Sequence, residues 1–284
     1  MAASASVAPA ASTARPRARG LPVLTATLRE SQALISAAAF YILAIGLLVG
    51  LLLPAFKTLN LGTYFSGSLG AIIGTSGVPP AVTFASYLAL ELYSSIFLLL
   101  FGGVMAFAAG GSIARNIEDG TIDITLARPI SRTRYYLEKW GALLLGSALL
   151  VGISIFTGWL DTVLFDGATL DWPSFLLAQV DIGAVFFCVV GIGLLISAVM
   201  SAGRAAGGAA TVVVVVMYLA QTFGTAADRL GFLKFLSPYY YAPAANVMIS
   251  QQWTDAWKVL IPVAAGLVAA LVGLVLFQRR DITA

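Results

Sequence analysis

Few side chains in this chain could carry out acid–base, nucleophilic or metal chemistry. The 284 residues include no histidine and a single cysteine, Cys188, which lies inside an apolar run. One cysteine can form neither an intrachain disulfide nor a thiolate cage, and no long apolar run contains a pair of carboxylates. Acid–base and metal catalysis lack their usual residues, so we expect no catalytic, cofactor or metal site on this chain.

The side chains that could bind a partner are concentrated in residues 114–139. This segment contains nine of the chain's 16 basic and 13 acidic residues. They are Arg115, Glu118, Asp119, Asp123, Arg128, Arg132, Arg134, Glu138 and Lys139. Apolar Ile122, Ile124 and Leu126 lie among them, and such a mixture favours docking into a protein groove, whereas a lipid-binding segment would be more uniformly basic. A solvated loop that follows the positive-inside rule is the alternative.

The composition places this segment in a membrane protein. Hydrophobic residues make up 60% of the chain and charged residues 10%, and the mean hydropathy is +0.94. Soluble domains contain about 25% charged residues, so a soluble globular fold is excluded. Uncharged stretches long enough to cross a bilayer predict an all-α polytopic protein. The six predicted transmembrane helices lie at 33–54, 92–113, 140–160, 182–202, 206–227 and 259–277.

A seventh uncharged stretch, 58–90, differs in composition. Its first half is rich in Gly and Ser, and it contains the helix-breaking pair Pro79-Pro80. A helix there would move the segment 114–139, with its five basic residues, to the outer side of the membrane. We therefore predict an ordered loop outside the bilayer.

Basic residues set the predicted orientation. With six spans, the N-terminal arm, the segment 114–139, the turn near residue 204 and the C-terminus lie on one side. These four segments carry 12 of the 16 Lys and Arg residues. The positive-inside rule makes that side cytoplasmic, so both termini should be cytoplasmic in a multi-pass protein of the cytoplasmic membrane. The net charge of +3 is thus explained by topology, and no nucleic-acid partner is expected.

The segments outside the spans have separate predictions. The composition of residues 1–21 predicts a disordered arm, and a transit peptide is the alternative. Residues 22–284 are predicted to form a single transmembrane domain. Residues 22–32 predict a short interfacial helix, because Leu24 and Leu28 share one face, or else an unstructured extension of the first span. Outer loops are predicted at 55–91, 161–181 and 228–258, the last with short helices.

Two acids, Glu91 and Asp181, are candidates for buried functional carboxylates. A full span fits on the inner side of each acid, so counting places both near the outer surface. We predict solvated interface residues, and a role at the outer mouth of a translocation path is the alternative.

Three groups of residues resemble one known family. The segment 118–121 (E-D-G-T), the segment 128–132 (R-P-I-S-R) and Lys139 resemble the E-x-G-T … P-[VI]-S-R … K pattern of type-2 ABC transporter permeases. The ending 277–282 (F-Q-R-R-D-I) is similar to the family's F-x-R-R-D ending. The segment 237–240 (S-P-Y-Y) resembles its S-P-F/Y segment. The resemblance covers nearly the whole chain, in the family's order.

The resemblance implies a type-2 ABC exporter transmembrane fold and a set of partners. Two permease subunits, identical or paralogous, would join two ATPase subunits, which bind ATP and Mg. The chain itself has no G-x-x-x-x-G-K-[ST] loop for phosphate. The loop between the second and third spans would hold the coupling helix that rests on the ATPase. Its predicted coupling residues are Glu118, Asp119, Gly120, Thr121, Ile122, Asp123, Ile124, Leu126, Arg128, Pro129, Ser131, Arg132 and Arg134.

Local roles within that loop follow from residue type. Gly120 would allow a tight turn, Pro129 would fix the exit from the coupling element, and Ser131 can cap the helix that leads into the third span.

By the same resemblance, spans 1, 2 and 5 would face the subunit interface and the substrate route. The candidate pathway or interface residues are Gly46, Gly50, Tyr87, Glu91, Tyr218, Gln221 and Thr222. For the glycine pairs Gly46/Gly50 and Gly203/Gly207, close packing of helices within one chain is the alternative. A mostly apolar route would suit a hydrophobic or amphipathic cargo, whose identity the sequence leaves open.

Three other classes of protein are alternatives to a permease. A secondary transporter would usually have acids at the membrane midplane and internal repeats. A membrane enzyme lacks its catalytic residues here. A scaffold or sensor built on the same permease fold has no distinguishing sequence feature, so only function separates it from an exporter.

Overall fold

The computed structural model describes residues 21–58, 83–93, 95–127, 130–253 and 255–280. Every regular element in these ranges is an α-helix or a short 3-10 helix. Nearly all of the predicted disordered arm, and most of the Gly- and Ser-rich loop, lie outside the described residues.

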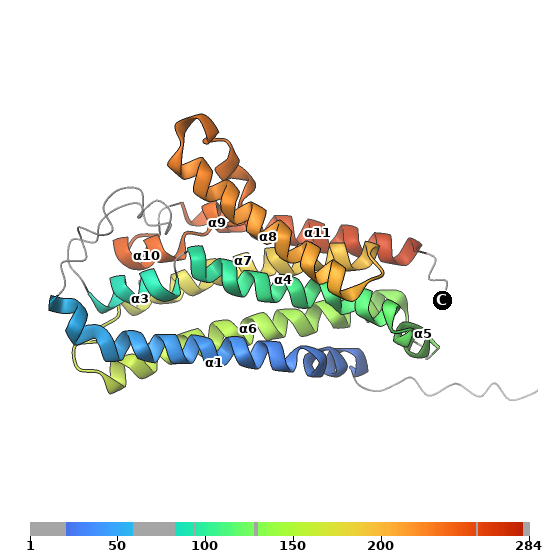
Figure 1. Cartoon of the computed structure of the whole chain (residues 1–284), viewed down its shortest axis with the longest axis horizontal. Helices are drawn as coiled ribbons and strands as arrows, with labels where there is room; N and C mark the ends of the chain where they lie inside the picture. The colour runs from blue at the N-terminus through green and yellow to red at the C-terminus, as the bar shows by residue number, and fades with distance from the viewer. Residues whose placement is uncertain (1–20, 59–82, 94, 128–129, 254, 281–284) are drawn as a thin grey trace, which may run out of the picture.

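Six helices in the described ranges are long and apolar enough to cross a membrane. They are α1 (Pro22–Thr58), α4 (Ser95–Glu118), α6 (Arg132–Leu164), α7 (Trp172–Val199), α8 (Gly203–Ala226) and α11 (Leu260–Arg279). Most of them lie side by side along the long axis of the molecule (Figure 1). These helices confirm the prediction of an all-α protein with six spans. Spans are helical because an α-helix pairs its backbone groups within the segment, where lipid offers no hydrogen-bond partner.

The helices extend beyond the predicted spans. α1 is continuous from Pro22 to Thr58, so the segment 22–32 is the first part of α1 and not a separate helix. α6 continues to Leu164 and α7 begins at Trp172, so most of the predicted outer loop 161–181 is helical. Charged residues mark the edge of the lipid, but backbone hydrogen bonding continues past that edge until a cap ends the helix.

Short elements fill the segments between the long helices. α3 (Phe84–Leu92) begins at a capping box formed by Thr83 and Ser86, and α5 (Thr121–Leu126) follows α4. The predicted short helices between 228 and 258 are present. They are η2 (Asp228–Leu230), η3 (Leu233–Leu236), α9 (Pro238–Tyr241), α10 (Ala244–Ser250) and η4 (Ala256–Val259). α3 and α10 lie at one end of the bundle, and α5 lies at the other (Figure 1).

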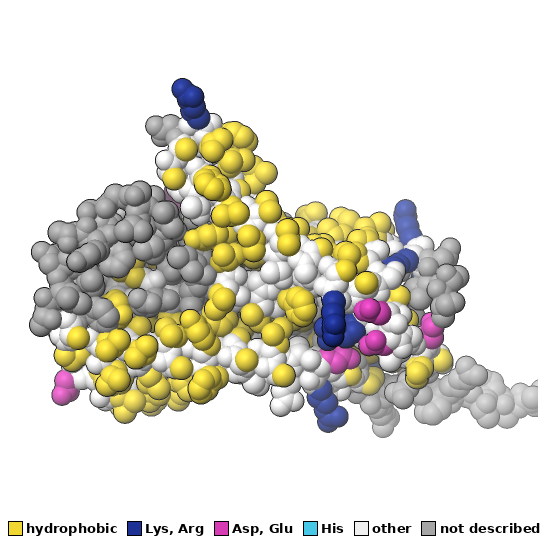
Figure 2. Space-filling view, viewed as in Figure 1, with side chains coloured by type: hydrophobic (Ala, Val, Ile, Leu, Met, Phe, Trp, Pro, Cys, Tyr) yellow, Lys and Arg dark blue, Asp and Glu magenta, His cyan; other side chains and the backbone are white. Residues whose placement is uncertain are grey.

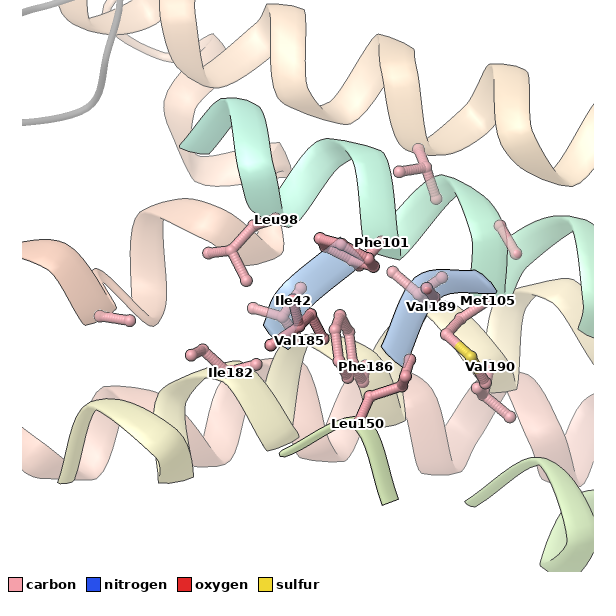
Figure 3. Packing of buried hydrophobic residues seen from close by; sticks show 14 of the residues in the cluster. Ile42, Leu98, Phe101, Met105, Leu150, Ile182, Val185, Phe186, Val189 and Val190 are labelled. Carbon is pink, nitrogen blue, oxygen red and sulfur yellow. The ribbon is translucent and has the colours of Figure 1, made fainter. Parts of the chain in front are cut away.

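α7 is the central helix of the bundle. It packs against α4, α6, α8, α10 and α11 and carries buried residues around its whole circumference, as expected for a helix that is apolar on all sides. Figure 3 shows Phe101 and Met105 of α4, with Ile42 of α1, packed beside Val185 and Val189 of α7. The core is therefore shared by helices that are far apart in the sequence.

One close crossing in this core joins α7 to α11. A Cβ atom on Gly191 would collide with the carbonyl oxygen of Gly266, and a Cβ on Gly266 would lie 2.7 Å from the Cα of Cys188. The two backbones touch here, which only glycine permits.

The substitution Gly266→Ala tests this crossing. Because the two helices must separate to admit a Cβ, we expect the free energy of unfolding in detergent to fall by about 1–3 kcal/mol. Gly152→Ala is the matched control, since Gly152 is exposed on α6 and a Cβ there would meet nothing within 4 Å. The control should be neutral or more stable by up to about 1 kcal/mol. Equal stabilities of the two variants would contradict the crossing.

Candidate functional site

One end of the bundle collects charged side chains, and we call it the charged end. It holds the starts of α1, α6 and α8, the ends of α4, α7 and α11, and the short helix α5 (Figure 1). Most of the Lys, Arg, Asp and Glu side chains visible in Figure 2 lie here, whereas hydrophobic side chains dominate the length of the bundle.

The turn at Gly120 sets the position of α5. Gly120 has a φ of 65°, in the left-handed region that favours glycine, and its amide donates to the carbonyl of Ile117 at 3.1 Å. The hydroxyl of Thr121 then donates to the carbonyl of Asn116 at 3.3 Å. These bonds end α4 and start α5 in a new direction, so the tight turn predicted at Gly120 is present.

α5 has a buried side and an exposed side. Ile122 is 1% exposed and belongs to the core of the bundle, whereas Ile124 is 68% exposed. Asp119 and Asp123 are also exposed. The side chain of Leu126, and residues 128–129, lie outside the described part. The exposed side of α5 therefore offers one large apolar side chain accompanied by two acids.

Two glutamates of the charged end bind the first amides of other helices. The Oε2 atom of Glu118 accepts a hydrogen bond from the amide of Gly203, at the start of α8, at 2.7 Å. The Oε2 atom of Glu138 accepts from the amides of Val23 and Leu24, at the start of α1, at 2.9 and 3.2 Å. A carboxylate at a helix N-terminus pairs orphan N–H groups and also complements the positive end of the helix dipole.

Two arginines bind the last carbonyls of other helices. Arg132 of α6 donates to the carbonyls of Gln278 and Arg280, at the end of α11, at 3.3 and 2.6 Å. Arg280 donates to the carbonyls of Ala198 and Met200, at the end of α7, at 2.9 Å in both cases. These contacts link α6 to α11 and α11 to α7 at their ends.

The predicted coupling residues therefore separate into those on the exposed side of α5 and those that make contacts within the chain. Glu118 and Arg132 bind helix ends within the chain, and Arg134 forms an ion pair with Glu138 at 2.7 Å. Ser131 caps α6 by accepting from the amide of Arg134 at 3.2 Å. The contacts of Glu118 and Arg132 were not expected from the sequence, because their partners are remote in the chain, whereas the cap at Ser131 was predicted.

The burial of Lys139 was not predicted from the sequence. Lys139 is 1% exposed, and its Nζ atom pairs with Glu30 of α1 at 3.0 Å. It also lies 5.8 Å from the centre of the Tyr135 ring, within the range of a cation–π contact. The pair holds the first part of α1 against α6.

The candidate pathway or interface residues lie on three helices, α1, α3 and α8. A Cβ on Gly46 would collide with Thr157 of α6, and one on Gly50 would lie 2.8 Å from a carboxylate oxygen of Asp161, also on α6. For these two glycines the structure shows the alternative of packing within one chain. Gly203 and Gly207 contact α4 in the same way.

The remaining candidates lie on α3 and α8. Tyr87 is buried on α3, and Glu91 belongs to the same helix, with its side chain outside the described part. Tyr218 of α8 meets Tyr239 of α9 edge-on, with ring centroids 6.2 Å apart. The hydroxyl of Thr222 donates to the carbonyl of Tyr218 at 3.1 Å, and Gln221 is partly buried on the same helix. Their role in a pathway stays a prediction.

Two acids at the end opposite α5 are fully buried. Asp181 is 0% exposed and accepts from the indole of Trp253 at 3.3 Å, so the prediction of a solvated residue is wrong. Asp161 is also 0% exposed, and neither of its carboxylate oxygens has a hydrogen-bond partner among the described residues. The number of residues between an acid and the next charged residue predicts how far the acid lies from each membrane surface. It does not predict whether other helices bury the acid.

The described residues contain no group of three or more His, Cys, Asp and Glu side chains placed to hold a metal ion. The candidate site is the exposed surface of α5, which is carried on helix ends that bind one another. Six membrane-length helices with such an end define a multi-pass membrane protein.

Comparison with known proteins identifies the family. The sequence model described as "ABC-2 family transporter protein" matches residues 73–282, well over half of the chain. The chain belongs to the ABC-2 family of transporter proteins, as the resemblance of its motifs implies. A component of this family serves membrane transport and is not itself catalytic. No curated protein sequence matches the chain.

Arg280→Ala tests the bonds between helix ends. Loss of hydrogen bonds from a charged group should lower the free energy of unfolding by about 1–3 kcal/mol. Arg279→Ala is the matched control, because Arg279 is the exposed neighbour on the same helix and should change stability by less than about 0.5 kcal/mol. Denaturant unfolding in detergent measures both. A similar loss in the two variants would refute the role of Arg280.

Asp161→Asn tests whether the buried carboxylate has a partner. Asparagine keeps the shape and removes the charge, so the variant should match or exceed the original stability, by up to about 1 kcal/mol. The exposed acid Asp166 supplies the control Asp166→Asn, which should be neutral. A clear loss of stability in Asp161→Asn alone would mean that a cation or donor pairs with this acid.

Proposed function

We propose that this chain is the permease subunit of an ABC exporter and that a separate ATPase drives it. The family match carries the proposal. The absence of a phosphate-binding loop from the sequence supports a separate ATPase. The complex would contain two permease subunits, identical or paralogous, and two ATPase subunits that bind ATP and Mg.

The charged end would face the cytoplasm. Of the 12 Lys and Arg residues in the described ranges, eight lie in the segments at this end, and the positive-inside rule favours the cytoplasmic side for them. The protein would then lie in the cytoplasmic membrane, with α5 on the side where ATP is available.

α5 would be the coupling helix. Its exposed Ile124 would enter a groove of the ATPase, and Asp119 and Asp123 would orient the contact through basic groups of the partner. Ile122 would instead anchor α5 to the permease. The apolar contact should supply most of the affinity, because each exposed ion pair contributes only about 0–1 kcal/mol.

The bonds between helix ends would transmit the motion of α5. Closure of the ATPase dimer would shift α5 together with the end of α4. Glu118 ties this end to the start of α8, and Arg132 ties the start of α6 to the end of α11. The bundle would then move by rigid-body rearrangement between inward-open and outward-open states. The mostly apolar spans would suit a hydrophobic or amphipathic cargo.

Copurification tests the proposal directly. The tagged protein would be extracted from its native membrane in mild detergent, and its partners identified by mass spectrometry. A stoichiometric partner with a phosphate-binding loop is the expected result, and any second permease would be found in the same sample. No ATPase after crosslinking at α5 would refute the proposal and favour a secondary transporter or a scaffold.

Ile124→Asp tests the coupling surface in the same assay. An acid in an apolar groove should weaken ATPase retention about ten-fold or more. Ala205→Asp is the matched control, because it adds an exposed acid at the charged end but in the first turn of α8, where an acid is favourable. Normal ATPase retention by Ile124→Asp would exclude α5 as the docking site. Equal losses in both variants would indicate a general effect of charge.

A further inference from the structure

A groove of about 360 Å³ lies between α1, α4 and α6 near the charged end. Its volume falls in the range of small-molecule sites, about 300–1,000 Å³. It includes neither α5 nor any of the candidate pathway residues, and the proposed function assigns no ligand to it.

The end of the groove nearest α5 is polar. It is lined by Glu30 and Ser31 of α1 and by Ser112 and Arg115 of α4. The serine hydroxyl hydrogens already donate to backbone carbonyls, at 2.8 Å from Ser31 to Thr27 and 2.8 Å from Ser112 to Ala109. A ligand in this part of the groove would therefore meet acceptor oxygens and one guanidinium.

The charge at this polar end is positive. Glu30 is paired with Lys139 at 3.0 Å, so its charge is compensated. The next acid on α4, Glu118, is bound to the start of α8. The side chain of Arg115 is exposed, and its guanidinium makes no hydrogen bond or ion pair within the described part of the chain. An arginine in this state suits a phosphate or carboxylate group.

The rest of the groove is apolar. Leu34 and Ala37 of α1 face Phe107 and Ala108 of α4 across it, with Leu143 of α6 also lining it. The small alanine side chains leave space between the two helices. From Thr27 to Ala37 the groove follows α1 over ten residues, or about 15 Å at the rise of an α-helix. The polar end and the apolar length together match an amphiphile with an anionic head and a hydrocarbon tail.

The depth of the groove favours a lipid of the bilayer. Its apolar part lies along the membrane-spanning parts of α1 and α4, and its polar end lies at the charged end, where lipid headgroups meet the protein. Ala33 and Ala37 are exposed on α1, so the groove is open to the side. We propose that it binds an anionic phospholipid of the leaflet at the charged end, with the headgroup on Arg115 and one acyl chain between α1 and α4.

Native mass spectrometry with defined lipids tests this proposal. The purified protein would be incubated with equal amounts of phosphatidylglycerol and phosphatidylcholine that have the same acyl chains. We expect phosphatidylglycerol to be retained about five-fold over phosphatidylcholine, the preference that one basic residue supplies near a membrane surface. Arg115→Gln should abolish the preference, and Arg115→Lys should keep most of it.

Matched controls separate the groove from general attraction. Arg29→Gln removes an exposed arginine of α1 that does not line the groove, and it should leave the preference unchanged. Ala37→Trp should fill the apolar part and reduce retention of both lipids. Ala44→Trp, at an exposed alanine outside the groove, should reduce neither.

Three results would overturn the proposal. The first is equal retention of the two lipids by the unmodified protein. The second is an equal loss of preference in Arg29→Gln and Arg115→Gln, which would mean diffuse attraction. The third is a different amphiphile that copurifies from the native membrane and is lost only in Arg115→Gln, which would make the groove a site for cargo. Each of these results can be distinguished from failure of the ATPase to copurify.

Discussion

Helix ends in a membrane protein carry unpaired backbone groups, and their pairing organises one whole end of this molecule. The first amides and last carbonyls of a helix have no partner within the helix. At the charged end, Glu118 and Glu138 bind first amides, and Arg132 and Arg280 bind last carbonyls. Each bond joins two different helices, so capping and assembly are achieved by the same contacts. The ends of the spans should therefore move together.

This arrangement gives the segment 114–139 two roles. Its outer side, with Ile124 exposed on α5, is available to a partner. Its inner side holds the bundle, through the buried Ile122 and the bond from Glu118 to α8. A force applied to α5 would reach α8 through that bond without any long mobile linker. The same two-sided arrangement places Arg115, one turn before Glu118, beside the groove proposed for an anionic lipid.

Tight packing dominates the interior between the two ends. α7 and α11 touch at Gly191 and Gly266, and α1 meets α6 at Gly46 and Gly50. In lipid there is no hydrophobic force between helices, so association depends on such close contact and on polar bonds. The exceptions are buried acids at the end opposite α5, where Asp181 has one donor and Asp161 has none among the described residues.

The sequence by itself determined the features that depend on local chemistry or on the bilayer. The six spans follow from uncharged stretches, because the lipid core excludes charge and requires helices. The turn at Gly120 and the cap at Ser131 follow from residue type, since both involve bonds within a few positions. The family was also evident, because its motifs lie in short contiguous segments.

Only the tertiary structure decided which charged residues are free and which are used internally. Glu118 and Arg132 lie in the same charged segment as Asp119 and Asp123. The residues that Glu118 and Arg132 bind lie 85 and 148 positions away in the chain. The burial of Lys139 and Asp181 depends on α1 and on Trp253, which are also remote. No local pattern encodes such contacts, because they arise from the packing of helices that the chain order does not place side by side.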